Sequence, residues 1–166
     1  MSVAQTLIQE LEMEAATTRR VLERVPDAHL GWTPHAKSRT LGQLAMHLAV
    51  NPAGVSSLAS QNPANFPENM ADPVPTSTAE VLAALDKSVA DAKGILSSMS
   101  DAQYAEIWRV LANGNEIMAM PRIAFLRAVL LNHWYHHRGQ LTVYLRMLDV
   151  PIPSVYGPSA DENPFI

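Results

Sequence analysis

The chain has 166 residues, of which 48% are hydrophobic and 17% are charged, and its formal net charge is −4. This composition is typical of a compact globular protein, so we expect a single domain over residues 1–166. The acidic balance and the scattered Lys and Arg residues argue against a nucleic-acid-binding surface. No stretch approaches the roughly 20 apolar residues that span a membrane, and the N-terminus lacks a signal-peptide pattern. We therefore expect a cytoplasmic protein that binds neither nucleic acid nor membrane.

Two helices are predicted in the first 60 residues. Residues 2–24 carry apolar side chains at helical spacing, with polar residues between them. A second apolar stripe predicts a helix from about Leu41 to about Ser60, and either Ser38 or Thr40 is a suitable N-cap for it. His47 lies at the edge of that stripe, so we expect its side chain to point into the core or its rim.

The next segment is a proline-rich connection that leads to a third helix. Residues 61–76 contain four prolines and cannot be helical throughout. The connection is long for two antiparallel neighbours and can carry the chain back along a bundle, so the helices on either side of it run in the same direction. Ser77 and Glu80 have the spacing of a capping box at the start of the third helix, which extends to about Met99. A second Ser-x-x-Gln pattern at residues 100–103 suggests another short helical start.

The pattern changes again before the last helix. Residues 105–120 flank Asn113-Gly114, the dipeptide that best suits a type I′ turn, and so favour a short β-hairpin or extended excursion. A broken helix is the alternative. Pro121 then suits the first position of a fourth helix that ends at about Leu148. The tail, residues 151–166, is rich in Pro and Gly and is expected to be extended over the surface.

Three of the six histidines fall within five residues of the fourth helix. His133 and His137 are four residues apart on the core-facing stripe and share one helix face, whereas His136 is rotated by about 100° from His137. A buried neutral imidazole with an unpaired ring nitrogen costs about 1–3 kcal/mol, which a shared metal ion would remove for both. His47 occupies a comparable core-edge position on another helix and is the third candidate ligand.

The spacing leaves two interpretations open: a metal site or ordinary core histidines. Because the chain contains no cysteine, any metal must be held by nitrogen and oxygen ligands. The residue after His133 is Trp134, where metalloproteases with a His-Glu-x-x-His motif carry a glutamate base. The site therefore does not follow that protease pattern.

Three separated motifs resemble the DinB-like (YfiT-like) family of metalloenzymes. The run HWYHHRGQL at residues 133–141, followed by YLR at 144–146, resembles the fourth-helix signature of that family. Residues 32–48, with the pattern W-x-P-H-x-K-S-x-T-L-G-Q-L-x-x-H-L, resemble its loop into the second helix. The tail motif YGPSADE at residues 156–162 is also similar to the family. The resemblance spans nearly the whole chain.

This resemblance implies an all-α four-helix bundle of up-down-down-up topology, with the extended or hairpin excursion between the third and fourth helices. It also implies that His47, His133 and His137 bind a divalent metal, nickel or zinc, with at least one coordination position left open. The implied function is a metal-dependent hydrolase or a thiol S-transferase that uses a low-molecular-weight thiol, and a homodimer is implied. The alternative is a non-catalytic, metal-stabilised stress-response or binding protein, in which Asp161 or Glu162 closes the coordination sphere.

Few other polar residues are candidates for the surroundings of this site. Arg138 and Gln140 lie beside the proposed ligands, and Asn51 is four residues after His47. For Arg138 we favour an ion pair with an acidic group that holds the helix in place over binding of a substrate anion. For His136 we favour a partly exposed or interface position over a catalytic one.

Overall fold

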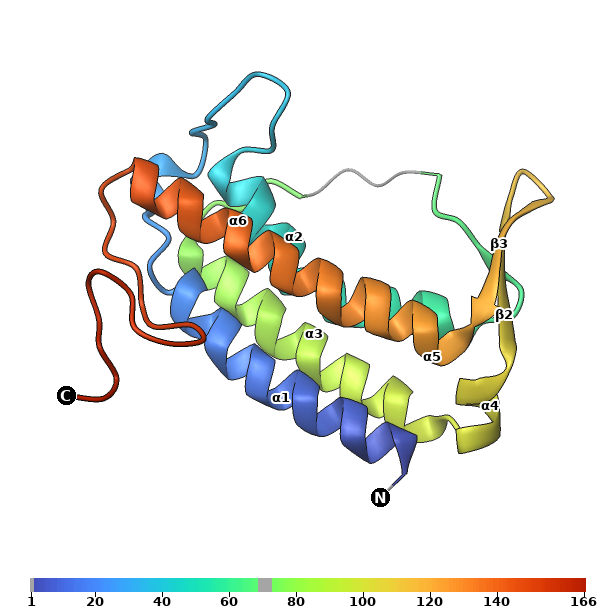
Figure 1. Cartoon of the computed structure of the whole chain (residues 1–166). Helices are drawn as coiled ribbons and strands as arrows, with labels where there is room; N and C mark the ends of the chain where they lie inside the picture. The colour runs from blue at the N-terminus through green and yellow to red at the C-terminus, as the bar shows by residue number, and fades with distance from the viewer. Residues whose placement is uncertain (1, 69–72) are drawn as a thin grey trace.

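The computed structural model describes residues 2–68 and 73–166. Within them, four long helices lie side by side as a bundle: α1 (Val3–Leu22), α2 (Leu41–Ser60), α3 (Thr78–Ser98) and α6 (His133–Met147) (Figure 1). The remaining elements are short: η1 (Asp27–His29), β1 (Ala64–Asn65), α4 (Asp101–Ala105), β2 (Ile107–Ala112), β3 (Asn115–Pro121), α5 (Arg122–Phe125) and η2 (Leu126–Asn132). No helix in the described part of the chain combines the length and hydropathy that crossing a membrane requires.

The helices have the predicted up-down-down-up directions. In Figure 1, α2 and α3 run in the same direction, and α1 and α6 run in the opposite one. Each long helix contacts two others, in the order α1–α3–α2–α6 around the bundle. The long second connection makes this order possible, because it brings the chain back to the end at which α2 begins. Residues 69–72 of that connection lie outside the described residues.

The polar residues before the helices cap them as their chemistry predicts. The Thr40 hydroxyl accepts the backbone N–H of Gln43, and the Gln43 side chain accepts the Thr40 N–H, which completes a capping box at the start of α2. At α3, the Ser77 hydroxyl accepts the N–H of Glu80, but the Glu80 carboxylate accepts the N–H of Thr76 at 2.7 Å. The expected capping box at α3 is therefore only half formed.

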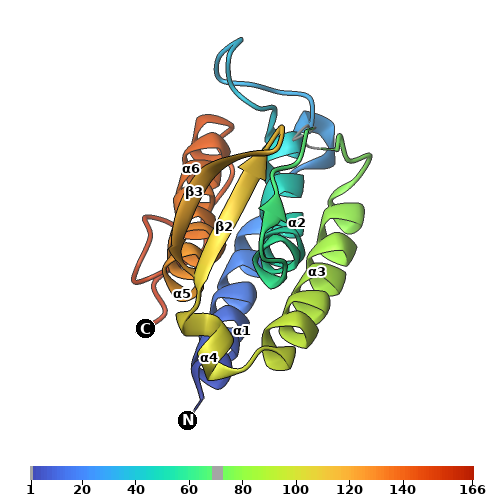
Figure 2. The ribbon, with the colours of Figure 1, turned by 90° about the vertical axis from the view of Figure 1, so that its right-hand side faces the viewer.

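The predicted hairpin is present, and the broken-helix alternative is wrong. Strands β2 and β3 pair antiparallel through a turn in which Asn113 and Gly114 both have positive φ, 50° and 77°, as a type I′ turn requires. The sequence did not reveal that β1 pairs in parallel with β2, so that β2 is the central strand of a small sheet (Figure 2). This sheet stands at the end of the bundle where α5 lies (Figure 1).

The fourth helix is less regular than predicted. Pro121 belongs to the end of β3 and caps α5, so it lies one residue before the helix and not at its first position. The segment η2 between α5 and α6 is π-helical, and the N–H of His133 bonds to the carbonyl of Ala128, five residues earlier. Such π-helical segments occur frequently at functional sites. Here the segment ends directly at the first of the two paired histidines.

Candidate metal centre

The bundle brings together the three histidines that the sequence singled out. His47 projects from α2, and His133 and His137 project from adjacent turns of α6. One ring nitrogen from each lies within 4.8 Å of those of the other two. The ring centroids are 5.3 Å apart for His47 and His133, 4.7 Å for His47 and His137, and 4.4 Å for His133 and His137. No Asp or Glu of the described residues belongs to this cluster.

The spacing of the ring nitrogens fits a small divalent ion. The Nε2 atoms of His133 and His137 lie 3.0 Å apart. Two nitrogens bound at about 2.0–2.1 Å to a tetrahedral ion are about 3.3 Å apart, so a slight opening of this pair accommodates the ion. Three neutral imidazoles are also a donor set that zinc and nickel accept. The residues present therefore fit the metal that the sequence resemblance implies.

Both paired histidines are held in the neutral form that binds a metal. Burial lowers the pKa of His133 to about 4, and the charges of the neighbouring histidines and of Arg39 add to the effect. The pKa of His137 is lowered by burial too, although its hydrogen bond to Gln140 acts in the opposite direction. Near pH 7 each ring therefore has a lone pair available without the loss of a proton.

Gln140 orients one of the two histidines. Its Oε1 lies 2.9 Å from Nδ1 of His137, so Nδ1–H donates and Nε2 is left to face the cluster. Its Nε2 in turn donates to the hydroxyl of Tyr144 at 3.4 Å, and the Tyr144 ring packs edge-on against Trp32 at 5.7 Å. By contrast, Nδ1 of His133 is buried and has no hydrogen-bond partner among the described residues. The His133 ring instead makes its polar contact through Nε2, which lies 3.0 Å from Nε2 of His137.

Arg138 and His136 lie as the sequence favoured. Arg138 is buried and forms an ion pair with the Glu14 carboxylate at 2.7 Å. It also donates to the Glu14 carbonyl and to the Thr18 hydroxyl. Arg138 therefore holds α6 against α1. His136 is exposed to solvent. Asn51 is buried and donates to the carbonyl of Leu130, so its side chain links α2 to η2.

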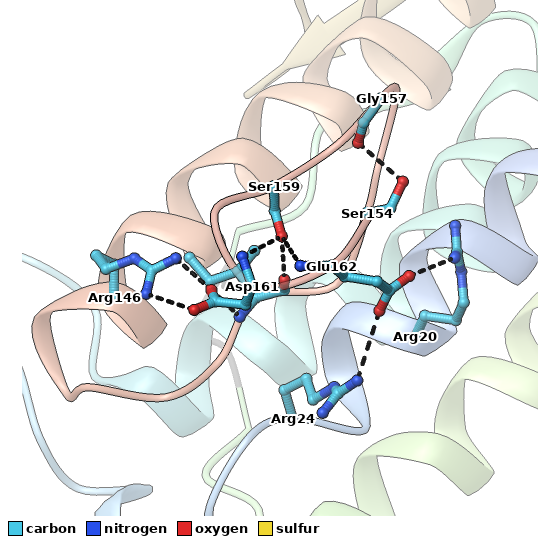
Figure 3. A network of polar contacts seen from close by, with 9 residues as sticks. Arg20, Arg24, Arg146, Ser154, Gly157, Ser159, Asp161 and Glu162 are labelled. Atoms are coloured by element: carbon cyan, nitrogen blue, oxygen red, sulfur yellow. Dashed lines mark hydrogen bonds and ion pairs between the residues drawn. The ribbon is translucent and has the colours of Figure 1, made fainter. Parts of the chain in front are cut away.

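The acidic residues of the tail have partners of their own (Figure 3). Asp161 pairs with Arg146 and accepts the backbone N–H of Ile152 at 2.9 Å. Glu162 lies 3.6 Å from Arg20 on α1 and 3.7 Å from Arg24, which follows that helix. These contacts fasten the tail to the bundle and leave neither carboxylate in the histidine cluster. The idea that Asp161 or Glu162 closes the coordination sphere therefore has no support in this structure.

The chain is similar in sequence and in fold to known proteins. The model of the DinB family matches residues 1–163. The uncharacterised protein YrdA of Bacillus subtilis is 27% identical over 161 residues, which cover 93% of this chain and 89% of that protein. A crystal structure of a DinB-like protein from Bacillus cereus superposes with a TM-score of 0.73 at 26% identity, covering 93% of this chain and 98% of the other.

A more distant solved structure has the same fold. YfiT from Bacillus subtilis superposes with a TM-score of 0.64 at 19% identity, covering 89% of this chain and 88% of YfiT. That protein is described as a probable metal-dependent hydrolase with an unusual four-helix bundle topology. At this identity the likeness establishes the fold that the two chains share.

Proposed function

Since this chain belongs to the DinB family, we propose that it is a metal-dependent hydrolase of small-molecule substrates. The observation that carries the proposal is the cluster of His47, His133 and His137, whose nitrogens converge without a carboxylate from the described residues. The fold neighbour YfiT, described as a probable metal-dependent hydrolase, supports the same reaction class. Nickel or zinc is the ion we propose for the site.

Four residues of the chain would hold the ion and orient its ligands in such a site. The three imidazoles hold the ion, and Gln140 fixes the proton of His137 on Nδ1, so that the ring binds through Nε2. When bound, a divalent ion supplies Lewis acidity and lowers the pKa of a water or thiol that it binds. Because three neutral ligands leave the ion its full charge, the open position favours an anion.

Arg39 adds to that positive potential. Its charge contributes to the low pKa values of both His133 and His137, which places it near the site from the loop before α2. Positive charge concentrated in this way attracts anionic ligands and raises their local concentration. We therefore propose a substrate, or attacking group, that binds in its anionic form.

A thiol S-transferase is the second candidate, and one observation favours it. The residue after His133 is Trp134, and no Asp or Glu of the described residues joins the cluster to act as a general base. A thiol has a pKa of about 8.5 and needs far less assistance to ionise than water does. A low-molecular-weight thiol is therefore a suitable nucleophile for this site.

The test combines metal analysis with activity. Protein purified without added metal is analysed for its metal content, then loaded with zinc or nickel and assayed against esters, amides and thiol–electrophile pairs. His133→Ala and His137→Ala should abolish both metal binding and turnover, whereas His136→Ala, at the exposed neighbour, should retain both. Turnover that survives in the first two variants contradicts the proposal. Metal binding without turnover on any substrate favours the non-catalytic, metal-stabilised alternative.

We also propose that the protein is a homodimer, on the strength of its resemblance to the DinB-like family, and that it is cytoplasmic, as its sequence patterns predict. Light scattering coupled to size-exclusion chromatography measures this directly. A mass near 18.2 kDa, that of one chain, would contradict the dimer.

A further inference from the structure

A proline inside α2 leaves one of the backbone carbonyls of this helix without its usual partner. Pro52 has no N–H, so the carbonyl of Leu48, four residues earlier, lacks the donor that a regular helix supplies. The indole Nε1–H of Trp134 on α6 donates to that carbonyl at 2.8 Å. The Trp134 side chain is only 1% exposed, so the bond is shielded from water. A side chain of α6 thus supplies the hydrogen-bond donor that the backbone of α2 lacks.

A second bond crosses the same boundary in the opposite direction. Asn51 Nδ2 on α2 donates to the carbonyl of Leu130 at 3.2 Å, and this bond is buried as well. Leu130 belongs to the π-helical segment η2, which ends directly before His133. We call these two bonds, Trp134 to Leu48 and Asn51 to Leu130, the interhelix pair. Together they restrain how far α2 can slide or rotate against the start of α6.

The interhelix pair lies directly beside the proposed metal ligands. Leu48 follows His47 in the chain, and Trp134 follows His133. His137 has its own orienting partner in Gln140, but Nδ1 of His133 has none among the described residues. The other ring nitrogen of His133, Nε2, faces His137 on the same helix. The position of the His133 ring relative to His47 therefore depends on the register of the two helix backbones. That register is what the interhelix pair restrains.

We propose that Trp134 and Asn51 are positioning residues that set the separation of His47 and His133 for metal binding. Pro52 is the third part of the device, because it frees the carbonyl that Trp134 uses. This inference rests on the proposal that the three histidines bind a metal. It assigns to a tryptophan, a proline and an asparagine a function that their own chemistry toward metals would not suggest.

The test substitutes Trp134→Phe, which keeps an aromatic ring and removes the N–H donor. The protein is freed of metal and titrated with Co²⁺, whose visible spectrum reports the coordination geometry. We expect the Co²⁺ affinity to fall about 10- to 100-fold, the range seen when groups that orient metal ligands are removed. We also expect the spectrum to change. Trp108→Phe is the matched control, since the buried Trp108 donates to the carbonyl of Gln61 at 2.8 Å, at the small sheet. It should leave affinity and spectrum unchanged.

A double variant separates positioning from simple stabilisation. Pro52→Ala restores a backbone N–H that can bond the Leu48 carbonyl within α2. In Trp134→Phe/Pro52→Ala the carbonyl is satisfied again, so the thermal stability should recover. The restraint between the helices is still missing, so Co²⁺ affinity and spectrum should not recover. If both properties recover together, the bond is merely structural and the inference is wrong.

The outcomes distinguish this inference from the proposed function. Unchanged Co²⁺ affinity and spectrum in Trp134→Phe contradict the positioning role alone. A wild-type protein that binds no Co²⁺ contradicts the metal site and the positioning role with it. If Trp134→Phe does not fold, Asn51→Leu removes the second bond at similar volume and is measured in the same way. A Co²⁺ affinity equal to wild type in that variant overturns the inference.

Discussion

The two faces of α6 have opposite characters. Toward α2 it presents His133 and His137, two neutral rings whose Nε2 atoms face each other, and Nδ1 of His133 has no hydrogen-bond partner among the described residues. Toward α1 it presents Arg138, whose guanidinium forms an ion pair with Glu14 and donates to the Thr18 and Tyr156 hydroxyls. Both faces are largely buried, and the charge of Arg138 is compensated by partners from the chain.

This difference separates a structural polar site from one suited to a ligand. A buried charge is tolerated when it is paired and hydrogen-bonded, and both terminal nitrogens of Arg138 have such partners on α1 and the tail. The histidine side leaves nitrogens that an ion can satisfy and lacks a compensating carboxylate among the described residues. The same helix therefore uses one face to hold the bundle together, and on the other it presents the candidate metal site.

The largest expected effect tests the Arg138 face. Arg138→Met keeps much of the side-chain volume but leaves the Glu14 carboxylate, only 14% exposed, without its cation. Breaking a buried ion pair by removal of one partner lowers the free energy of unfolding by about 3–5 kcal/mol. Urea denaturation of the metal-free wild type and of metal-free Arg138→Met measures this loss of free energy. A control at the exposed pair of Arg109 and Glu116, Arg109→Met, should change the free energy of unfolding by less than about 1 kcal/mol.

The next effect tests the histidine face by removal of one ligand. Structural zinc sites bind with about 10–16 kcal/mol shared by four ligands, or about 2.5–4 kcal/mol for each, so His137→Ala should weaken metal binding about 100- to 1,000-fold. His137→Ala removes no compensated charge from the metal-free protein. Its free energy of unfolding should therefore fall far less than that of Arg138→Met. Isothermal titration with Zn²⁺ and urea denaturation measure the two properties. A metal affinity equal to wild type contradicts the site.

A smaller effect is expected at Gln140, which orients His137 through Nδ1. Gln140→Leu removes the acceptor at 2.9 Å and should weaken Zn²⁺ binding about 10- to 100-fold. Gln140→Glu retains an acceptor oxygen at the same position and should keep most of the affinity. Equal affinities in Gln140→Leu and wild type would show that packing alone orients the ring.

Much of this architecture follows from local patterns in the sequence. Helical periodicity gave the spans of the long helices, and Asn113-Gly114 identified the turn because its positive φ values suit those two residues. The pair His133 and His137 is visible because a helix places residues four apart on one face. His47 was assigned to the same site from its core-edge position and from the family resemblance.

Other features depend on contacts between distant segments and leave no local signal. The two residues of β1 lie in a proline-rich connection and become a strand only by pairing with β2. The π-helical segment η2 preserves the apolar stripe, so periodicity does not distinguish it from a regular helix. Pro52 is visible in the sequence, but nothing there indicates that Trp134 supplies the missing donor.

The smallest effect concerns the tail, which extends the network of the Arg138 face. Arg146 and the N–H of Ile152 hold the pKa of Asp161 below its ordinary value of 3.8. A carboxyl whose pKa is lower in the folded protein stabilises it above the unfolded value and loses that contribution as the pH falls through the folded value. Hydrogen exchange at the Ile152 amide should therefore accelerate, relative to the intrinsic rate, only below about pH 3.8.

Asp161→Asn should remove that pH dependence, because the amide cannot titrate. Its Ile152 amide should exchange faster than in the wild type at neutral pH, since the ion pair with Arg146 is lost. Because the Asp161 carboxylate belongs to the tail and not to the histidine cluster, Zn²⁺ affinity in this variant should equal that of the wild type. A loss of Zn²⁺ affinity would show that the tail and the histidine face are coupled, and the two faces of α6 would then not be independent.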